Sequence, residues 1–91
     1  MILVPLSEAK LNGTGGLHVA SRIIGGILVT ADGTNDATIV IRRENSSGAM
    51  VFHLVTKSPA FIAGPIFCNT QEIYVSCTGT GAGVFLYEWI N

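Results

Sequence analysis

One stretch decides the fold class: Ala37-Thr38-Ile39-Val40-Ile41-Arg42-Arg43, residues 37–43. Its aliphatic side chains at positions 37, 39 and 41 alternate with Thr38, Val40 and Arg42. Because successive side chains of a strand point to opposite faces, this pattern predicts a β-strand with one core face and one mostly wet face. The flanking segments 32–36 and 45–48 are rich in Gly, Asn, Asp and Ser, which favour turns.

The same pattern extends over the rest of the chain after residue 16. Short β-type runs recur at intervals of roughly ten residues, the spacing of a sandwich or barrel. We expect strands over 17–30 (one strand, or two broken at Gly25-Gly26), 37–43, 49–56, 60–68, 72–78 and 83–90, with hairpin loops at 32–36 and 45–48. Pro59 and Pro65 lack a backbone donor, which predicts a peripheral position for 60–68. The predicted fold class is all-β, a small antiparallel β-sandwich.

The composition combines many apolar residues with few charges. Of 91 residues, 48% are hydrophobic and 12% are charged, whereas an ordinary soluble domain has about 25% charged residues. Polar residues and glycines interrupt the apolar ones every few positions, so the chain lacks the ~18 consecutive apolar residues of a membrane helix. We therefore expect self-association to cover the apolar surplus. The net charge of -1 predicts neither nucleic acid nor a membrane as a partner.

Two of the predicted strands are apolar on both faces. In 49–56, Met50, Phe52 and Leu54 form the expected core face, and the opposite face is too apolar for open water. In 83–90, neither face is plainly polar, which suggests cover from outside the strand's own sheet. We predict that six side chains contribute to a subunit interface: Val51, His53, Val55, Phe85, Tyr87 and Trp89.

The first sixteen residues differ from the remainder. An apolar tip is followed by a polar stretch and by the glycine-rich segment 12–16, which is typical of a flexible tether. We expect an arm and tether over 1–16 and a sandwich domain over 17–91, with an additional edge strand as the alternative form of the arm. Four arm residues are predicted to dock on a partner: Ile2, Leu3, Val4 and Leu6. The tip lacks the basic region of a secretion signal, so we expect folding in a reducing cytoplasm.

The two cysteines are expected to be free thiols. If 69–70 formed a hairpin turn, Cys68 and Cys77 would be separated by six pairs of residues, about 20 Å. A disulfide needs Cα atoms within about 7 Å. Cys77 is predicted to be a small core residue beside Ile73 and Val75.

No catalytic set, metal site or cofactor is predicted. His18 and His53 stand far apart among aliphatic residues and match neither a nucleophilic triad nor a zinc spacing. Asp32 and Asp36 are a weak alternative for a calcium site, because hard cations normally need more oxygen ligands. The segment 79–83 lacks the Lys and Ser/Thr of a P-loop and is expected to be a hairpin loop.

Four segments together carry a resemblance to a known class of proteins. They are Gly-Gly-Ile-Leu-Val-Thr-Ala-Asp-Gly-Thr-Asn-Asp-Ala-Thr-Ile (25–39), Ile-Tyr-Val-Ser (73–76), Gly-Thr-Gly-Ala (79–82) and Leu-Tyr-Glu-Trp (86–89). These segments resemble small all-β virion proteins of tailed bacteriophages, including the capsid decoration (cement) proteins that sit as trimers on the capsid lattice.

The resemblance implies a jelly-roll-like subunit, a homotrimer and contact with a major capsid protein. It also implies a structural, non-enzymatic function on the capsid surface of a virion, after synthesis in the bacterial host cytoplasm. A tail or head-fibre component is an alternative with the same resemblance. A carbohydrate-binding module is another, because aromatic side chains along one strand can stack on sugar rings. A small hydrolase would need a cleft that holds His18 or His53 beside an acid.

Overall fold

The computed structural model describes residues 2–13, 15–20 and 22–90, and of residues 7–10 and 12 the backbone only. These residues form eight strands and no helix: β1 (Ile2–Asn12), β2 (Gly15–Ala20), β3 (Ile24–Thr30), β4 (Ala37–Arg43), β5 (Met50–Thr56), β6 (Ala60–Ile66), β7 (Glu72–Thr78) and β8 (Gly83–Ile90). The predictions for 37–43, 72–78 and 83–90 match β4, β7 and β8 residue for residue. The break in 17–30 comes after Ala20 and before Ile24, not at Gly25-Gly26.

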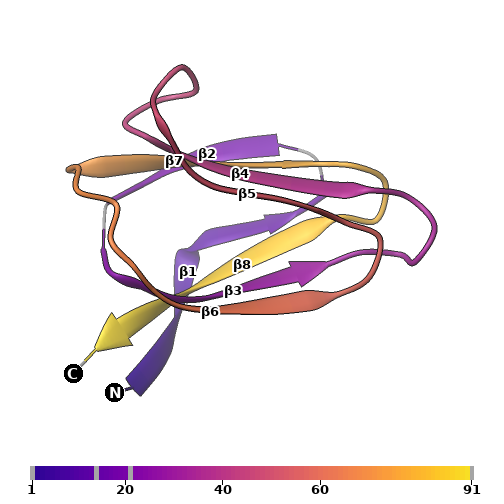
Figure 1. Cartoon of the computed structure of the whole chain (residues 1–91), viewed down its shortest axis with the longest axis horizontal. Coiled ribbons are helices and arrows are strands. Elements are labelled where there is room, and N and C mark those ends of the chain that lie inside the picture. The colour runs from indigo at the N-terminus through magenta and orange to yellow at the C-terminus, as the bar shows by residue number, and fades with distance from the viewer. Residues whose placement is uncertain (1, 14, 21, 91) are drawn as a thin grey trace.

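The strands form two four-stranded antiparallel sheets that pack face to face (Figure 1). Sheet A has the order β1-β8-β3-β6, and sheet B has the order β2-β7-β4-β5. The pairs β1–β8, β2–β7, β3–β6 and β4–β5 are nested, as in one long hairpin rolled into a sandwich. Eight strands in this order are a jelly roll. The predicted antiparallel β-sandwich of jelly-roll type is confirmed, and the edge position expected for 60–68 is that of β6.

Two of the three predicted hairpin loops cross between the sheets instead. The segment 32–36 joins β3 of sheet A to β4 of sheet B, and 79–82 joins β7 of sheet B to β8 of sheet A. Only 45–48 closes a hairpin, between β4 and β5. Turn-forming residues indicate where the chain bends, but they do not determine which sheet the next strand joins.

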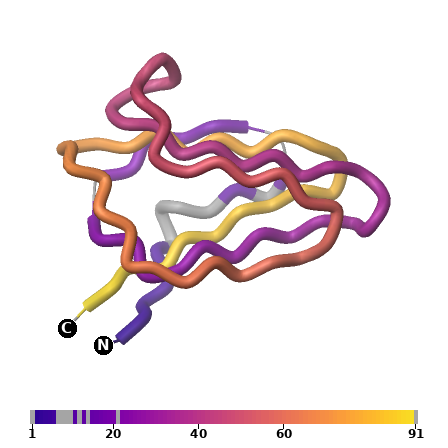
Figure 2. The backbone as a smooth tube through the Cα atoms, in the orientation of Figure 1, coloured from indigo at the N-terminus to yellow at the C-terminus, as the bar shows by residue number. Residues whose placement is uncertain are grey.

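The N-terminal segment forms an edge strand of sheet A. Residues Ile2–Asn12 pair with β8, with Ile2 opposite Ile90 and Asn12 opposite Gly83. A large bulge between Pro5 and Lys10 interrupts the register. Gly15 and Gly16, which the sequence suggested as tether, begin β2, and Met1 and Thr14 lie outside the described residues. The two ends of the chain lie side by side at one corner of the sandwich (Figure 2).

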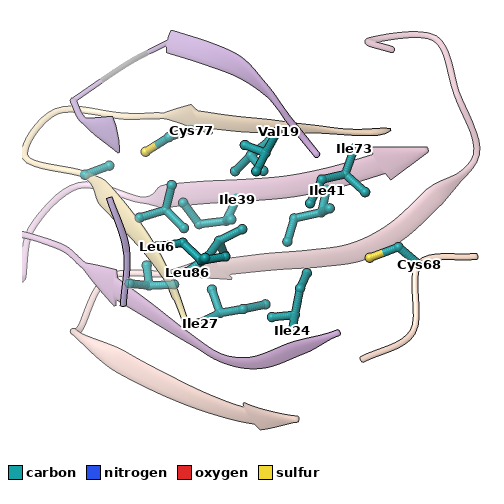
Figure 3. Close-up of a cluster of buried hydrophobic side chains, with 14 of the residues drawn as sticks. Leu6, Val19, Ile24, Ile27, Ile39, Ile41, Cys68, Ile73, Cys77 and Leu86 are labelled. Atoms are coloured by element: carbon teal, nitrogen blue, oxygen red, sulfur yellow. The ribbon is translucent and has the colours of Figure 1, made fainter. Parts of the chain in front are cut away.

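The core lies between the sheets and is entirely apolar among the described side chains. The largest fully buried side chains are Ile24, Ile27, Val29, Ile39, Ile41, Ile73, Val75, Cys77, Val84 and Leu86. Figure 3 shows how they converge from both sheets, with Leu6 of β1 beside Leu86. Each buried aliphatic side chain of this size contributes about 1.5–3 kcal/mol. No titratable pair enters this core, so its role is to hold the two outer faces in place.

The loop between β3 and β4 is held together by one carboxylate. Asp32 accepts hydrogen bonds from the backbone N–H groups of Thr34 and Asn35 and from the Asn35 side chain, each at 2.8 Å. These bonds favour the ionised form and lower the pKa of Asp32 to about 2. The hydrogen bond from the Asn35 backbone N–H makes the largest contribution.

This loop gives the protein an acid-sensitive element. Because the folded pKa lies below the ordinary value of 3.8, the contribution of Asp32 to stability is present above about pH 4 and is lost as the pH falls to about 2. We expect an NMR titration of the Asp32 carboxyl carbon to give a midpoint near pH 2 and the Asn35→Ala variant to have a higher one. Equal midpoints in the two proteins would contradict the role of Asn35.

Candidate interaction surface

The outer face of sheet A carries apolar side chains on all four strands. Phe85, Tyr87 and Trp89 of β8 lie on the opposite side of the sheet from the buried Val84 and Leu86. Cross-strand neighbours continue the surface on both sides of β8. We define the apolar face by eight residues: Leu3, Pro5, Leu28, Phe61, Ala63, Phe85, Tyr87 and Trp89. All eight are partly or largely exposed.

Two glycines form the floor of this face. A Cβ atom on Gly26 would collide with the Phe61 ring, and a Cβ atom on Gly25 would collide with the Leu3 side chain. The large side chains therefore lie across β3 where it has no side chains of its own. Phe61 meets Tyr87 edge to face, with ring centroids 5.8 Å apart and planes at 70°. Gly25-Gly26 is thus a bulged part of β3 that accommodates an aromatic cluster, and not a strand break.

The outer face of sheet B is polar by comparison. The Nδ1 atom of His18 lies 2.9 Å from the Oε1 atom of Glu72. Thr38 lies opposite Thr78, and the Ser76 hydroxyl donates to the Val40 carbonyl at 3.4 Å. The sandwich therefore has one outer face suited to water and one suited to contact with another apolar surface.

The structure divides the six predicted interface residues between two sides of the molecule. Phe85, Tyr87 and Trp89 lie together on the apolar face. His53 and Val55 lie on the outer side of β5, in the other sheet. Val51 occupies a bulge between the pairs Ile41–Phe52 and Arg42–Met50 and packs against the core.

The bulge in β5 also corrects its predicted core face. Phe52 and Leu54 pack against the core, as expected. Met50 is 49% exposed, because the extra residue at position 51 reverses the alternation on its N-terminal side. The sequence pattern alone contains no signal for this insertion.

The predicted arm residues separate in a similar way. Leu6 is buried in the core, so it anchors β1 and is closed to a partner. Leu3 belongs to the apolar face, while Ile2 and Val4 are 60% and 36% exposed on the other side of the strand. Together, residues 2–5 and 87–90 form a two-stranded segment with apolar side chains on both sides, which we call the terminal ribbon. Glu88, opposite Val4, is the one charged residue of the ribbon and forms an ion pair with Arg22 at 3.9 Å.

Groups with chemical reactivity are dispersed. Cys68 and Cys77 are buried and form no disulfide, as predicted. The hairpin on which that prediction depended is wrong, because β6 and β7 belong to different sheets. Burial raises the pKa of the Cys77 thiol. Within the described ranges, no three His, Cys, Asp or Glu side chains come together in a group that could hold a metal ion.

A shallow groove of about 250 Å³ lies between two connecting segments. It is lined by Arg22, Ile23, Phe67, Cys68, Asn69 and Thr70. The hydroxyl of Thr70 is buried without a hydrogen-bond partner in the described structure. Sequence analysis missed this groove, because the β2–β3 and β6–β7 connections become neighbours only in the folded sandwich.

The fold and the apolar face define a class, a jelly-roll sandwich with an uncovered apolar sheet face. A scan against protein-family models finds no match, and searches of the curated proteins and of the solved structures find none. In the described part of the chain, no helix is long and apolar enough to cross a membrane.

Proposed function

We propose that this protein is a structural, non-enzymatic virion component, a capsid decoration (cement) protein that binds the outer capsid surface of a tailed bacteriophage as a homotrimer. The apolar face is the observation that carries the proposal, because a sheet face with three aromatic side chains on one strand suits a protein interface. Jelly rolls recur among viral capsid proteins, which agrees with the resemblance of the sequence to small phage virion proteins.

In the proposed trimer, the apolar face provides the contact between subunits. Phe85, Tyr87 and Trp89 are supported from below by the packed core and from the side by Leu28 and Phe61, so they are held in place before association. Preformed side chains lose little conformational freedom on binding. Burial of this face contributes about 25 cal/mol per Å² of apolar surface.

The terminal ribbon is the part proposed to contact the major capsid protein. It carries exposed apolar side chains at Ile2, Val4 and Ile90, and the buried Leu6 anchors β1 just beyond it. A trimer presents three ribbons, and simultaneous engagement of several sites raises the overall affinity well above that of a single site. Such multivalent contact would join neighbouring capsomers.

A double substitution in the ribbon tests the docking role. Deletion of residues 1–10 is unsuitable, because it would remove Leu6 from the core and most of an edge strand. We expect Ile2→Asp/Val4→Asp to remain a trimer and to bind the phage's own undecorated capsids about 30-fold more weakly, since two apolar contacts would be lost. Co-sedimentation with purified capsids measures this binding.

The matched control is Thr34→Asp/Thr80→Asp, which adds the same charges to exposed loops at the other end of β8. This variant should bind capsids as the unmodified protein does. If Ile2→Asp/Val4→Asp binds capsids as tightly as the unmodified protein, the ribbon has no docking role. If both variants bind capsids more weakly to the same extent, the loss is a general effect of added charge.

A tail or head-fibre component is the alternative that would use the same surface, and the capsid-binding experiment distinguishes it from a capsid decoration protein.

Carbohydrate binding is the second candidate, since jelly rolls also include lectins and the apolar face is aromatic. The edge-to-face arrangement of Phe61 and Tyr87 does not provide two parallel ring surfaces for a sugar, which favours a protein partner. A glycan-dependent change in the fluorescence of Trp89, the only tryptophan, would support the sugar alternative.

A further inference from the structure

Tyr74 lies on the outer face of sheet B, in the central strand β7, between the buried Ile73 and Val75. Its partner on β2 is His18, and Gly16 lies diagonally across, two residues further along β2. Side chains of a strand stand roughly perpendicular to the sheet, and the Cα atoms of diagonal neighbours are about 7–8 Å apart. A Cβ atom on Gly16 would nevertheless collide with the hydroxyl end of Tyr74. The Tyr74 ring therefore lies along the sheet and rests on β2 at Gly16, with its other face turned away from the protein.

The imidazole of His18 lies beside this ring. The two ring centroids are 4.9 Å apart, and the planes meet at 66°. The Nδ1 atom of His18 lies 2.9 Å from the Oε1 atom of Glu72, and Glu72 is the partner of Ala20 on β2. His18 thus leans towards Ala20 and Tyr74 leans towards Gly16, in opposite directions along β2. The imidazole therefore does not cover the outward face of the phenol ring.

The neighbours of Tyr74 along β7 and on β4 also leave the ring open. Ser76 is the next outward residue of β7 and has a small side chain. Arg42 lies opposite Tyr74 on β4, and its guanidinium donates to the Gly48 carbonyl at 3.1 Å, which holds it towards the β4–β5 loop. We define the tyrosine platform by five residues: Gly16, His18, Glu72, Tyr74 and Ser76.

The polar groups of the platform are suited to accept hydrogen bonds. The side chains of His18 and Glu72 are 50% and 53% exposed. When Nδ1 of a neutral imidazole donates to a carboxylate, Nε2 is an acceptor, and the carboxylate keeps further acceptor sites. The Ser76 hydroxyl already donates to the Val40 carbonyl, so its oxygen is left as an acceptor. A ligand of this platform should therefore combine a ring that stacks on Tyr74 with several O–H donors.

A neutral sugar has this combination, because its C–H groups form an apolar face that packs on an aromatic ring and its hydroxyls lie around the edge. Nucleic acid bases also stack on aromatic rings, but the Glu72 carboxylate would repel their phosphates, and the net charge of -1 provides no attraction. We propose that the tyrosine platform binds a neutral pyranose sugar, with the sugar ring on Tyr74 and its hydroxyls on His18 and Glu72. The site goes beyond the proposed trimer, because it lies on the outer face of the other sheet.

NMR titration of the whole protein measures the binding. An open site that holds one sugar ring should have a dissociation constant of about 1–10 mM. The probes are methyl β-D-galactopyranoside, methyl β-D-glucopyranoside and methyl α-D-mannopyranoside. At least one of them should shift the backbone amide signals of His18 and Tyr74 and leave those of Tyr87 and Trp89 in place. No shift with any of the three would overturn the proposal.

An organic cation is the competing ligand, because an aromatic ring beside a carboxylate also suits a quaternary ammonium group. Choline is therefore titrated in parallel. Shifts of His18 and Tyr74 with choline, and with none of the three glycosides, would overturn the sugar site in favour of a cation site.

Substitutions at Tyr74 test the stacking. Tyr74→Ala removes the ring and should weaken sugar binding at least about tenfold. Tyr74→Phe keeps the ring and loses only the hydroxyl, so it should bind within about twofold of the unmodified protein. Unweakened binding by Tyr74→Ala would overturn the platform, and an equal loss in both variants would show that the ring face is not the contact.

The variant Tyr87→Glu separates this site from the proposed trimer and from a sugar on the apolar face. It alters the outer face of sheet A and leaves the tyrosine platform intact, so it should bind the sugar as the unmodified protein does, whatever its native mass. Loss of sugar binding in Tyr87→Glu, or shifts centred on Tyr87 and Trp89 in the unmodified protein, would overturn the platform as the sugar site.

Discussion

Replacing Tyr87 with glutamate is expected to convert the proposed trimer into monomers. Tyr87 lies in the middle of the apolar face, opposite Gly26 and in edge-to-face contact with Phe61. A carboxylate at this point would be buried without a partner in every subunit contact. Loss of a central aromatic contact costs 2 kcal/mol or more, so the dissociation constant should rise at least about 30-fold. Light scattering over a hundredfold dilution measures the native mass.

The chain provides a closely matched control in Tyr74. This tyrosine is also half-buried on the outer face of a central strand, β7 of sheet B, and it meets His18 edge to face at 4.9 Å. Tyr74→Glu should therefore leave the native mass unchanged. An unmodified protein that is monomeric at every concentration would contradict the trimer, and dissociation of both variants would show that the apolar face is not the specific contact.

Ile39→Ala should have the largest effect on folding stability. Ile39 is fully buried in the middle of β4, and side chains of both sheets surround it (Figure 3). Removing its outer methyl groups loses their burial and leaves a cavity, which typically costs 2–5 kcal/mol. The free energy of unfolding of a whole domain is only about 5–15 kcal/mol. Urea denaturation at one fixed protein concentration measures the difference.

Ile2→Ala is the matched control for this prediction. It removes the same atoms from an isoleucine that is 60% exposed in the terminal ribbon, where substitutions usually change stability by less than about 0.5 kcal/mol. A similar loss of stability in the two variants would mean that Ile39 is not at the centre of the core.

Strands whose pattern is local could be predicted from the sequence, and contacts between distant residues could not. The alternation in 37–43, 72–78 and 83–90 was sufficient to locate β4, β7 and β8, because the side of a strand on which a residue lies depends only on its position along that strand. The aromatic row of β8 was found in the same way. Leu28 and Phe61 were missed as its neighbours, because they join it only through the pairing of β3 with β8 and β6.

The structural roles of Gly25-Gly26 and of Leu6 depend on side chains that are distant in the sequence. Gly25-Gly26 resembles a strand break, yet the Leu3 and Phe61 side chains cover these glycines inside a continuous strand. Leu6 resembles part of a free arm, yet the pairing of β1 with β8 places it in the core. In both cases the deciding contact comes from a residue distant in the sequence.

Residue order along the chain was enough to establish the β-class, the positions of β4, β7 and β8 and the apolar surplus, because each depends on composition or on a few adjacent residues. The nested pairing of strands, which brings Ile2 beside Ile90, was decided only by tertiary structure. That pairing collects the apolar outer residues on sheet A and the polar ones on sheet B. Such pairing depends on the packing of both sheets together, a sum over contacts between distant residues that no short segment contains.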